Sequence, residues 1–311
     1  MQKKKNIRLL IALSLVIAAI TTLQLFKRTN SNLGVEKTIF QLEDQQEITD
    51  VYLSSELLEN HFKFQNGHWE LNDTLLLDQS MRDVFFSVLS KVEIRKPVVE
   101  SSKDSLANFL KTNGTRAIIT FGEDVIKDYW VGGNPELEVT WIMDSQNQVP
   151  YQVHIPGYQS YLAGIFTVPD TDWRSRFIFN LNFALLKGIE IEYPTSGEKL
   201  VMNYGNSFFS IPGVRADSTK IANFLDNLAF LQADRFLSSD ELIDEYENLV
   251  NDNLVFATVK MIRVSGDTNS ITFYNHQPGK RFILAQVDDS SFAVFNYERI
   301  KAIFKTKSDF E

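Results

Sequence analysis

The chain has 311 residues, of which 44% are hydrophobic, and its 24 Phe, 10 Tyr and 4 Trp exclude a disordered chain and allow about two folded domains. It contains no cysteine, which excludes disulfide scaffolds, thiol nucleophiles and cysteine-bound metal centres. The first 28 residues carry six basic residues and no acidic one, so the other 283 residues hold 25 basic and 40 acidic residues, and their formal charge of −15 disfavours nucleic-acid binding.

The N-terminal region predicts a membrane anchor. Residues 9–25 form an uncharged run of seventeen residues, close to the length that crosses a bilayer as a helix. Four basic residues precede the run and two follow it, which favours a cytoplasmic N-terminus and an extracytoplasmic, periplasmic body. A cleaved signal peptide is the alternative, although the bulky sequence after the run lacks a small-residue cleavage site. We therefore expect a cytoplasmic stub and single transmembrane helix over residues 1–28.

Residues 29–47 are polar and predict a tether with one apolar anchor at Ile39, Phe40 and Leu42. Beyond the tether, the sequence contains an internal repeat of about 140 residues, which predicts two related units over residues 48–182 and 183–311. Each unit opens with two β-type segments, of which 66–71 and 206–211 correspond.

A helix follows in each unit, with apolar residues on one face. In the first unit these are Met81, Val84, Phe85 and Val88, and in the second they are Ile221, Phe224, Leu225 and Leu228. Asp78 and Asp217 precede the helices as N-cap residues. A connector (94–99 and 232–237) then leads to a second, shorter helix in each half.

Four short strands joined by tight turns close each half, over 115–155 and 255–296, followed by a short helix. Segregated strands and helices predict an α+β fold with mainly antiparallel sheets. Residues 154–180 are expected to be an insertion of the first unit.

Motifs for catalysis are missing from the sequence. It has no HExxH, GxSxG, P-loop or dinucleotide-binding motif, and none of its four histidines shows the spacing of a helical metal pair. Gly132-Gly133 predicts a tight turn with positive φ rather than a phosphate cradle. We therefore expect no enzymatic activity, no cofactor and no metal, while an unrecognised hydrolase around His154, Asp170 and Asp172 stays an alternative.

Several aromatic and charged residues form a candidate binding surface: Trp130, Trp141, His154, Tyr158, Asp172, Trp173 and Arg174. The aromatic members could form a platform for a glycan or a peptide, although packing on the sheet explains them as well. In the Asp172-Trp173-Arg174 string, an arginine can pair with a carboxylate and stack on an indole, which would hold an irregular loop on the sheet.

The strings YWVGG (129–133), HIPGYQSYL (154–162) and DWRSRFIFN (172–180), behind a lysine-rich start and one span, resemble the bacterial domain-of-unknown-function family numbered 4340. The resemblance covers most of residues 45–300, and it implies a membrane-anchored extracytoplasmic protein. Members often lie beside transport systems of the ABC type used in gliding motility. No catalytic residue of the family is available to transfer.

The function expected from the sequence is that of a non-enzymatic membrane-anchored protein that binds another envelope protein, such as a subunit of an ABC-type transporter. A module that binds cell-envelope glycans or peptides through Trp130, Trp141 and Tyr158 is the alternative.

Overall fold

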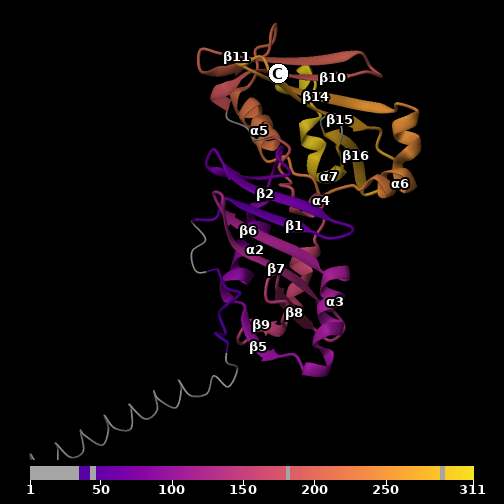
Figure 1. Ribbon diagram of the computed structural model, residues 1–311. Helices are drawn as coiled ribbons and strands as arrows, with labels where there is room; N and C mark the ends of the chain where they lie inside the picture. The colour runs from indigo at the N-terminus through magenta and orange to yellow at the C-terminus, as the bar shows by residue number, and fades with distance from the viewer. Residues whose placement is uncertain (1–34, 43–46, 180–182, 288–290) are drawn as a thin grey trace, which may run out of the picture. The chain divides into compact units, whose positions relative to one another are not determined.

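The computed structural model describes residues 35–42, 47–179, 183–287 and 291–311. Over these residues the chain forms two compact units (Figure 1). Unit 1 combines the chain up to Asp73 with Ser80–Val168, and unit 2 combines Thr74–Gln79 with Pro169–Glu311. The predicted membrane span lies outside the described residues, within which no helix is both long enough and apolar enough to cross a bilayer.

Unit 1 is built on an antiparallel sheet. Its strands are β1 (Asp50–Ser54), β2 (Glu59–Gln65), β3 (His68–Leu71), β5 (Glu93–Pro97), β6 (Thr115–Phe121), β7 (Asp124–Asn134), β8 (Val139–Asp144) and β9 (Pro150–His154). They lie side by side in the order β3-β2-β1-β6-β7-β8-β9-β5, and the two-residue strand β4 (Leu75–Leu76) pairs with β3 at the edge of this sheet. The four strands predicted between residues 115 and 155 are therefore confirmed, as β6 to β9.

Unit 2 repeats this sheet strand by strand. Its strands are β10 (Leu186–Tyr193), β11 (Glu198–Gly205), β12 (Phe208–Ser210), β13 (Arg235–Phe236), β14 (Val255–Arg263), β15 (Thr268–Tyr274), β16 (Phe282–Val287) and β17 (Ser291–Asn296). The order β12-β11-β10-β14-β15-β16-β17-β13 matches that of unit 1 at every position. The predicted α+β class with two related antiparallel units is confirmed.

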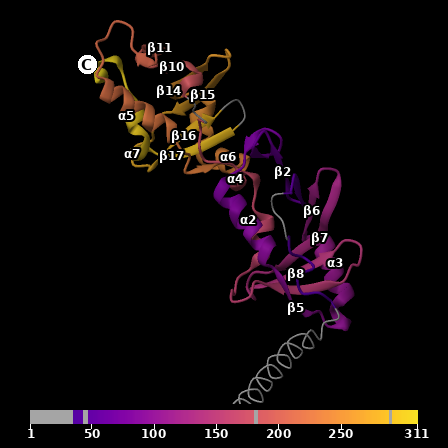
Figure 2. The ribbon, with the colours of Figure 1, turned by 90° about the vertical axis from the view of Figure 1, so that its left-hand side faces the viewer.

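Each sheet has a helix on either face (Figure 2). In unit 1 these are α2 (Gln79–Lys91) and α3 (Lys103–Asn113), and in unit 2 they are α5 (Ser218–Ala229) and α6 (Ser239–Asn251). Short helical turns complete the chain: η1 (Glu100–Ser102), η2 (Leu162–Thr167), α4 (Asp170–Trp173), η3 (Phe183–Leu185), α7 (Tyr297–Ile300), η4 (Lys301–Ile303) and η5 (Lys307–Phe310). Alternate residues of a strand face opposite ways, so the two helices of a unit pack on different sets of side chains of the same sheet.

The buried face of α2 differs from the prediction. The helix buries Phe85, Phe86 and Leu89, whereas Val84 is exposed. Apolar side chains surround much of this helix, and the two phenyl rings fill the core against Phe62 of β2, whose ring centroid lies 5.9 Å from that of Phe85. The predicted face around Met81 and Val84 was therefore wrong by about one residue.

The prediction for α5 is confirmed. Ile221, Phe224 and Leu228 are buried, and the carboxylate of Asp217 caps the helix by accepting a 2.7 Å hydrogen bond from the backbone N–H of Thr219. Phe224 and Leu228 follow their counterparts in α2 by 139 positions, so the two helices correspond with a spacing one residue shorter than predicted.

Two pairs of strands were not predicted. Two opening strands were predicted in each unit, but the structure has three, because β2 and β11 pair with the strands on either side of them. The expected connectors contain β5 and β13, which add an edge strand at the end of each sheet. Strands β5 and β13 are short and form at the sheet edge through pairing with β9 and β17, which lie far away in the sequence.

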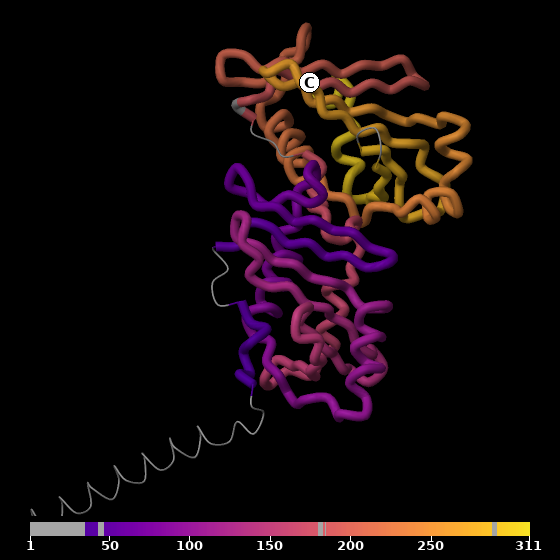
Figure 3. The backbone as a smooth tube through the Cα atoms, viewed as in Figure 1, coloured from indigo at the N-terminus to yellow at the C-terminus, as the bar shows by residue number. Residues whose placement is uncertain are grey.

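Part of the expected tether belongs to unit 1, as the indigo trace in Figure 3 shows. Phe40 and Leu42 are buried, whereas Ile39 is exposed. The backbone N–H of Ile94 in β5 donates to the carbonyl of Lys37 at 2.9 Å, and the N–H of Leu42 donates to the last turn of α2 at 3.1 Å. Residues 37–42 are therefore a structural lead-in to unit 1.

The same lead-in precedes the sheet of unit 2. The N–H of Ala233 donates to the carbonyl of Arg176 at 2.9 Å, and Phe179 is buried. All three residues follow their unit 1 counterparts by 139 positions, and the sequence IFQL of residues 39–42 returns as IFNL at 178–181. The repeat therefore starts earlier than predicted, and the end of the expected insertion 154–180 opens the second unit instead.

The hairpins β2–β3 and β11–β12 share one turn. Asn66 and Gly67 have φ of 53° and 81°, and Asn206 and Ser207 have φ of 53° and 66°. Two consecutive residues with positive φ are typical of the type I′ turn, which fits the twist of a two-residue hairpin. Unit 2 therefore keeps, with a serine, a backbone conformation that glycine adopts at little cost.

Candidate functional site

The predicted binding surface is divided between the two units. Four of its residues, Trp130, Trp141, His154 and Tyr158, belong to unit 1, and the other three, Asp172, Trp173 and Arg174, belong to unit 2. Within the described residues, no group of three or more His, Asp or Glu side chains is arranged to hold a metal ion.

Trp130 and Trp141 lie on the α3 face of the unit 1 sheet. The pairing of β7 with β8 sets Trp130 opposite Met143 and Trp141 opposite Gly132, so all four residues point to one face. Both indoles are half-buried and pack with Met143 beneath α3. They form a small second core with Met143, so packing on the sheet accounts for both indoles.

A groove of about 420 Å³ opens beside Trp141. It is lined by residues from the end of β5, from η1 and α3, and from β7 and β8: Val98, Ser102, Ser105, Leu106, Phe109, Gly133, Asn134 and Trp141. Phe109 is 38% exposed at this groove, and the adjoining residues Val99 and Leu137 are also exposed. The lining is mostly apolar, and its polar side-chain groups are the uncharged hydroxyl, amide and indole groups of Ser102, Ser105, Asn134 and Trp141, which suits apolar side chains of a ligand.

The glycine pair has a different role from the predicted turn. Gly132 and Gly133 lie inside β7, and neither has a positive φ. A Cβ atom on Gly133 would stand 2.2 Å from the carbonyl oxygen of Val139 and 2.6 Å from the ring of Tyr161. Glycine is required here because the backbone of β8 and an aromatic ring approach closely.

Next to Trp130 lies a charged pair on the same face. Arg116 donates from Nε and Nη2 to the two carboxylate oxygens of Asp128 at 2.9 and 2.8 Å. This bidentate contact lowers the pKa of Asp128 below its usual range. The guanidinium carbon of Arg116 is also 6.0 Å from the centre of the Trp130 ring.

The HIPG string forms a turn at the end of β9. The N–H of Tyr158 donates to the carbonyl of Ile155 at 2.9 Å, with Pro156 and Gly157 between them and a φ of 78° at Gly157. These features define a type II turn, in which proline and glycine take their preferred positions. The turn leaves the Tyr158 ring 67% exposed, and His154 ends the strand just before it.

The DWR string anchors the lead-in of unit 2. Trp173 is fully buried, and its carbonyl accepts a 2.8 Å hydrogen bond from the N–H of Asp78. The guanidinium of Arg174 lies 4.0 Å above the ring of Phe236, while Asp172 is exposed. The string therefore acts in packing, much as the sequence suggested, with Phe236 as the aromatic partner that the structure identifies.

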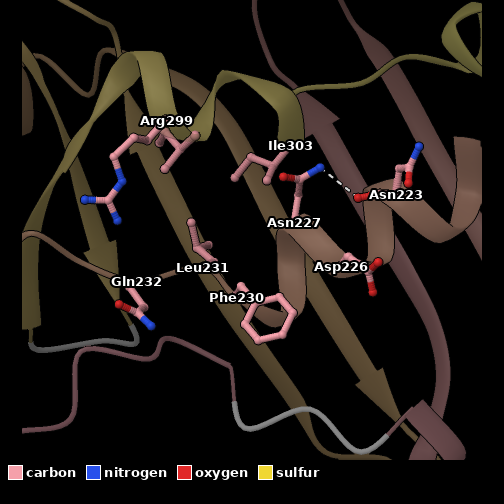
Figure 4. Close-up of a pocket in the computed structure, with 9 residues that line it drawn as sticks. Asn223, Asp226, Asn227, Phe230, Leu231, Gln232, Arg299 and Ile303 are labelled. Atoms are coloured by element: carbon pink, nitrogen blue, oxygen red, sulfur yellow. Dashed lines mark hydrogen bonds between the residues drawn. The ribbon is translucent and has the colours of Figure 1, made fainter.

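Unit 2 has a cavity of about 500 Å³ that was not predicted from the sequence (Figure 4). It lies between the end of α5 and the start of α7, and its lining is Asn223, Asp226, Asn227, Phe230, Leu231, Gln232, Arg299, Ile300 and Ile303. The polar residues Asn223, Asp226 and Asn227 stand at helical spacing on one side of α5. That spacing was visible in the sequence, but exposed polar residues on a helix are usually only solvated, and nothing marked Arg299 as their neighbour.

Neither a protein-family model, nor a curated protein, nor a solved structure matches this chain.

Proposed function

We propose that the chain is a non-enzymatic, membrane-anchored extracytoplasmic protein that binds another envelope protein through the groove beside Trp141. The observation that carries the proposal is the mostly apolar lining of that groove, with Phe109 exposed in it and Val99 and Leu137 exposed beside it. Apolar surface of this kind on a folded unit favours contact with a partner. The anchor over residues 1–28 and the placement outside the cytoplasm are part of the same proposal, on the sequence evidence above.

Charge indicates the partner's chemistry. The loop that follows the groove residue Asn134 carries Glu136 and Glu138, and Asp104 lies on α3 between two lining residues; all three are exposed. Residues 29–311 have a formal charge of −15 in total. We therefore propose a partner segment in which an apolar side chain enters the groove and lysine or arginine residues flank it. A subunit of an ABC-type transport system is the partner class that the family resemblance suggests.

Site-specific photo-crosslinking in intact membranes tests this proposal. A benzophenone amino acid at Ser105, in the groove, is expected to capture one envelope protein, whereas the same group at Asn108, exposed on α3 but outside the lining, is expected to capture none. The adduct should disappear in Phe109→Asp and persist in Val84→Asp, a matched change at an exposed residue of α2. Mass spectrometry of the adduct should identify an apolar segment with flanking basic residues.

Three results would contradict the proposal: equal adducts from Ser105 and Asn108, an adduct that Phe109→Asp leaves unchanged, or a captured segment that is acidic. Circular dichroism of both Asp variants separates a lost contact from a lost fold.

A further inference from the structure

The cavity of unit 2 combines an apolar floor with hydrogen-bonding groups on its walls. Leu231, Ile300 and Ile303 are buried beneath it. Phe230, at the end of α5, leaves 70% of its surface exposed at the rim. A flat apolar ring beside a polar hollow is the arrangement on which a sugar ring can stack through its C–H face.

The polar groups stand on two sides of this hollow. Figure 4 shows Asn223 and Asp226 on one side, and Gln232 and Arg299 on the other. Among the described residues, the side chains of Asn223, Asp226 and Gln232 have no hydrogen-bond partner, so they can turn to a ligand. These amides and the carboxylate supply both donors and acceptors, as recognition of hydroxyl groups requires.

Charge in the cavity decides against an anionic ligand. The guanidinium of Arg299 is paired with Asp234, its Nη1 lying 3.1 Å from Oδ1. Asp234 is fixed in turn by the N–H of Asn296, which donates to its other oxygen at 2.7 Å. The only positive charge of the lining is therefore compensated, whereas Asp226 has no cationic partner among the described residues. A phosphate or carboxylate would therefore meet no free cation among the described residues that line this cavity.

We propose that this cavity binds a short neutral saccharide, with Phe230 stacked on a sugar ring and Asn223, Asp226 and Gln232 bonded to its hydroxyl groups. The site is distinct from the groove of unit 1, and the proposal does not depend on the protein-binding function. It places the proposed glycan site in this cavity rather than at Trp130, Trp141 and Tyr158.

The test is a titration of the full chain, purified in a detergent without a sugar headgroup, by calorimetry and saturation-transfer NMR. The probes are the N-acetylglucosamine–N-acetylmuramic acid disaccharide with its lactyl group amidated, cellobiose, and an Ala-Glu-Lys-Ala peptide. We expect at least one disaccharide to bind. Phe230→Ala should weaken it by about tenfold or more, whereas Phe208→Ala, a change at a similarly exposed ring of unit 2 (73%), should leave it unchanged.

Asp226→Asn separates the ligand classes. An amide oxygen still accepts from a hydroxyl group, so saccharide binding should fall by only about two- to fivefold. A ligand held by an ammonium group would lose far more. The proposal is overturned if no disaccharide binds at 20 mM or if Phe230→Ala leaves binding intact. Binding of the peptide alone, with loss in Asp226→Asn, would overturn it in favour of a peptide ligand held through an ammonium group.

Discussion

Exchanging the turn residues between the two hairpins tests whether the units share one backbone design. Ser207 holds a φ of 66° where the equivalent Gly67 holds 81°. A residue with a Cβ atom in this region costs about 1–2 kcal/mol relative to right-handed conformations. Glycine also has more conformational freedom than serine in the unfolded chain, and this favours unfolding by about 0.4–1 kcal/mol. The difference predicts that Ser207→Gly raises the free energy of unfolding by about 0.5–1 kcal/mol.

The reverse change, Gly67→Ser, should lower it by a similar amount in unit 1. A Cβ atom at Gly67 would meet no heavy atom within 4 Å, so the change reports backbone conformation alone. Urea denaturation gives the global values, and a shift in melting temperature of about 1–4 °C is expected for units of this size. Hydrogen exchange read by mass spectrometry should show the effect in β11 and β12 for one variant, and in β2 and β3 for the other. If Ser207→Gly is neutral or destabilising, the shared type I′ turn is not what stabilises these hairpins.

Three further predictions concern stability. Gly133→Ala places a methyl carbon 2.2 Å from a backbone oxygen of the neighbouring strand. We expect urea denaturation to show that the free energy of unfolding falls by about 1–3 kcal/mol. A smaller loss would mean that β7 and β8 move apart easily. Tyr129→Phe removes a buried hydroxyl with no partner among the described residues, so the free energy of unfolding should stay unchanged or rise by up to about 1 kcal/mol. Tyr193→Phe removes a 3.0 Å hydrogen bond to the carbonyl of Lys305, and the free energy of unfolding should fall by about 1 kcal/mol. Equal losses in the two variants would refute this reasoning. Arg116 lowers the pKa of Asp128, so the pair stabilises unit 1 above the ordinary aspartate pKa and loses this effect as the pH falls through the lowered value. Arg116→Met should therefore destabilise the chain at pH 7 and destabilise it less at pH 3. A constant difference in the free energy of unfolding across this range would contradict the assignment.

The sequence predicted the parts of the fold that local patterns encode. Strands β6 to β9 and β14 to β17 alternate apolar and polar residues between turn residues, so their existence and antiparallel arrangement could be foreseen. The edge strands β5 and β13 could not, because a short edge strand forms through pairing with a distant segment. The lead-ins around Phe40 and Phe179 were missed for the same reason, since a few apolar residues in a polar stretch indicate burial only once their partners are known.

The candidate sites were harder to foresee than the fold. Trp141 was recognised as an aromatic on a strand, and the structure places it at the groove. The role of Gly133 depends on a close approach to another strand and to Tyr161, which no local pattern reveals. The cavity of unit 2 joins α5 to Arg299, about seventy positions further along the chain, so only the folded unit brings its walls together.

The assignment of residues 74–79 to unit 2 has a consequence for synthesis. In that unit the carbonyls of Leu76 and Trp173 accept hydrogen bonds from Ser175 and Asp78. A ribosome that adds about 5–20 residues per second makes the later partners roughly 5–20 s after the earlier ones. The segment 74–79 therefore lacks these two hydrogen bonds until residues 173–175 have been made, and a truncated chain starting at Pro169 would lack the segment altogether. Nascent chains arrested shortly before and after residue 175 should differ in their resistance to protease at this segment.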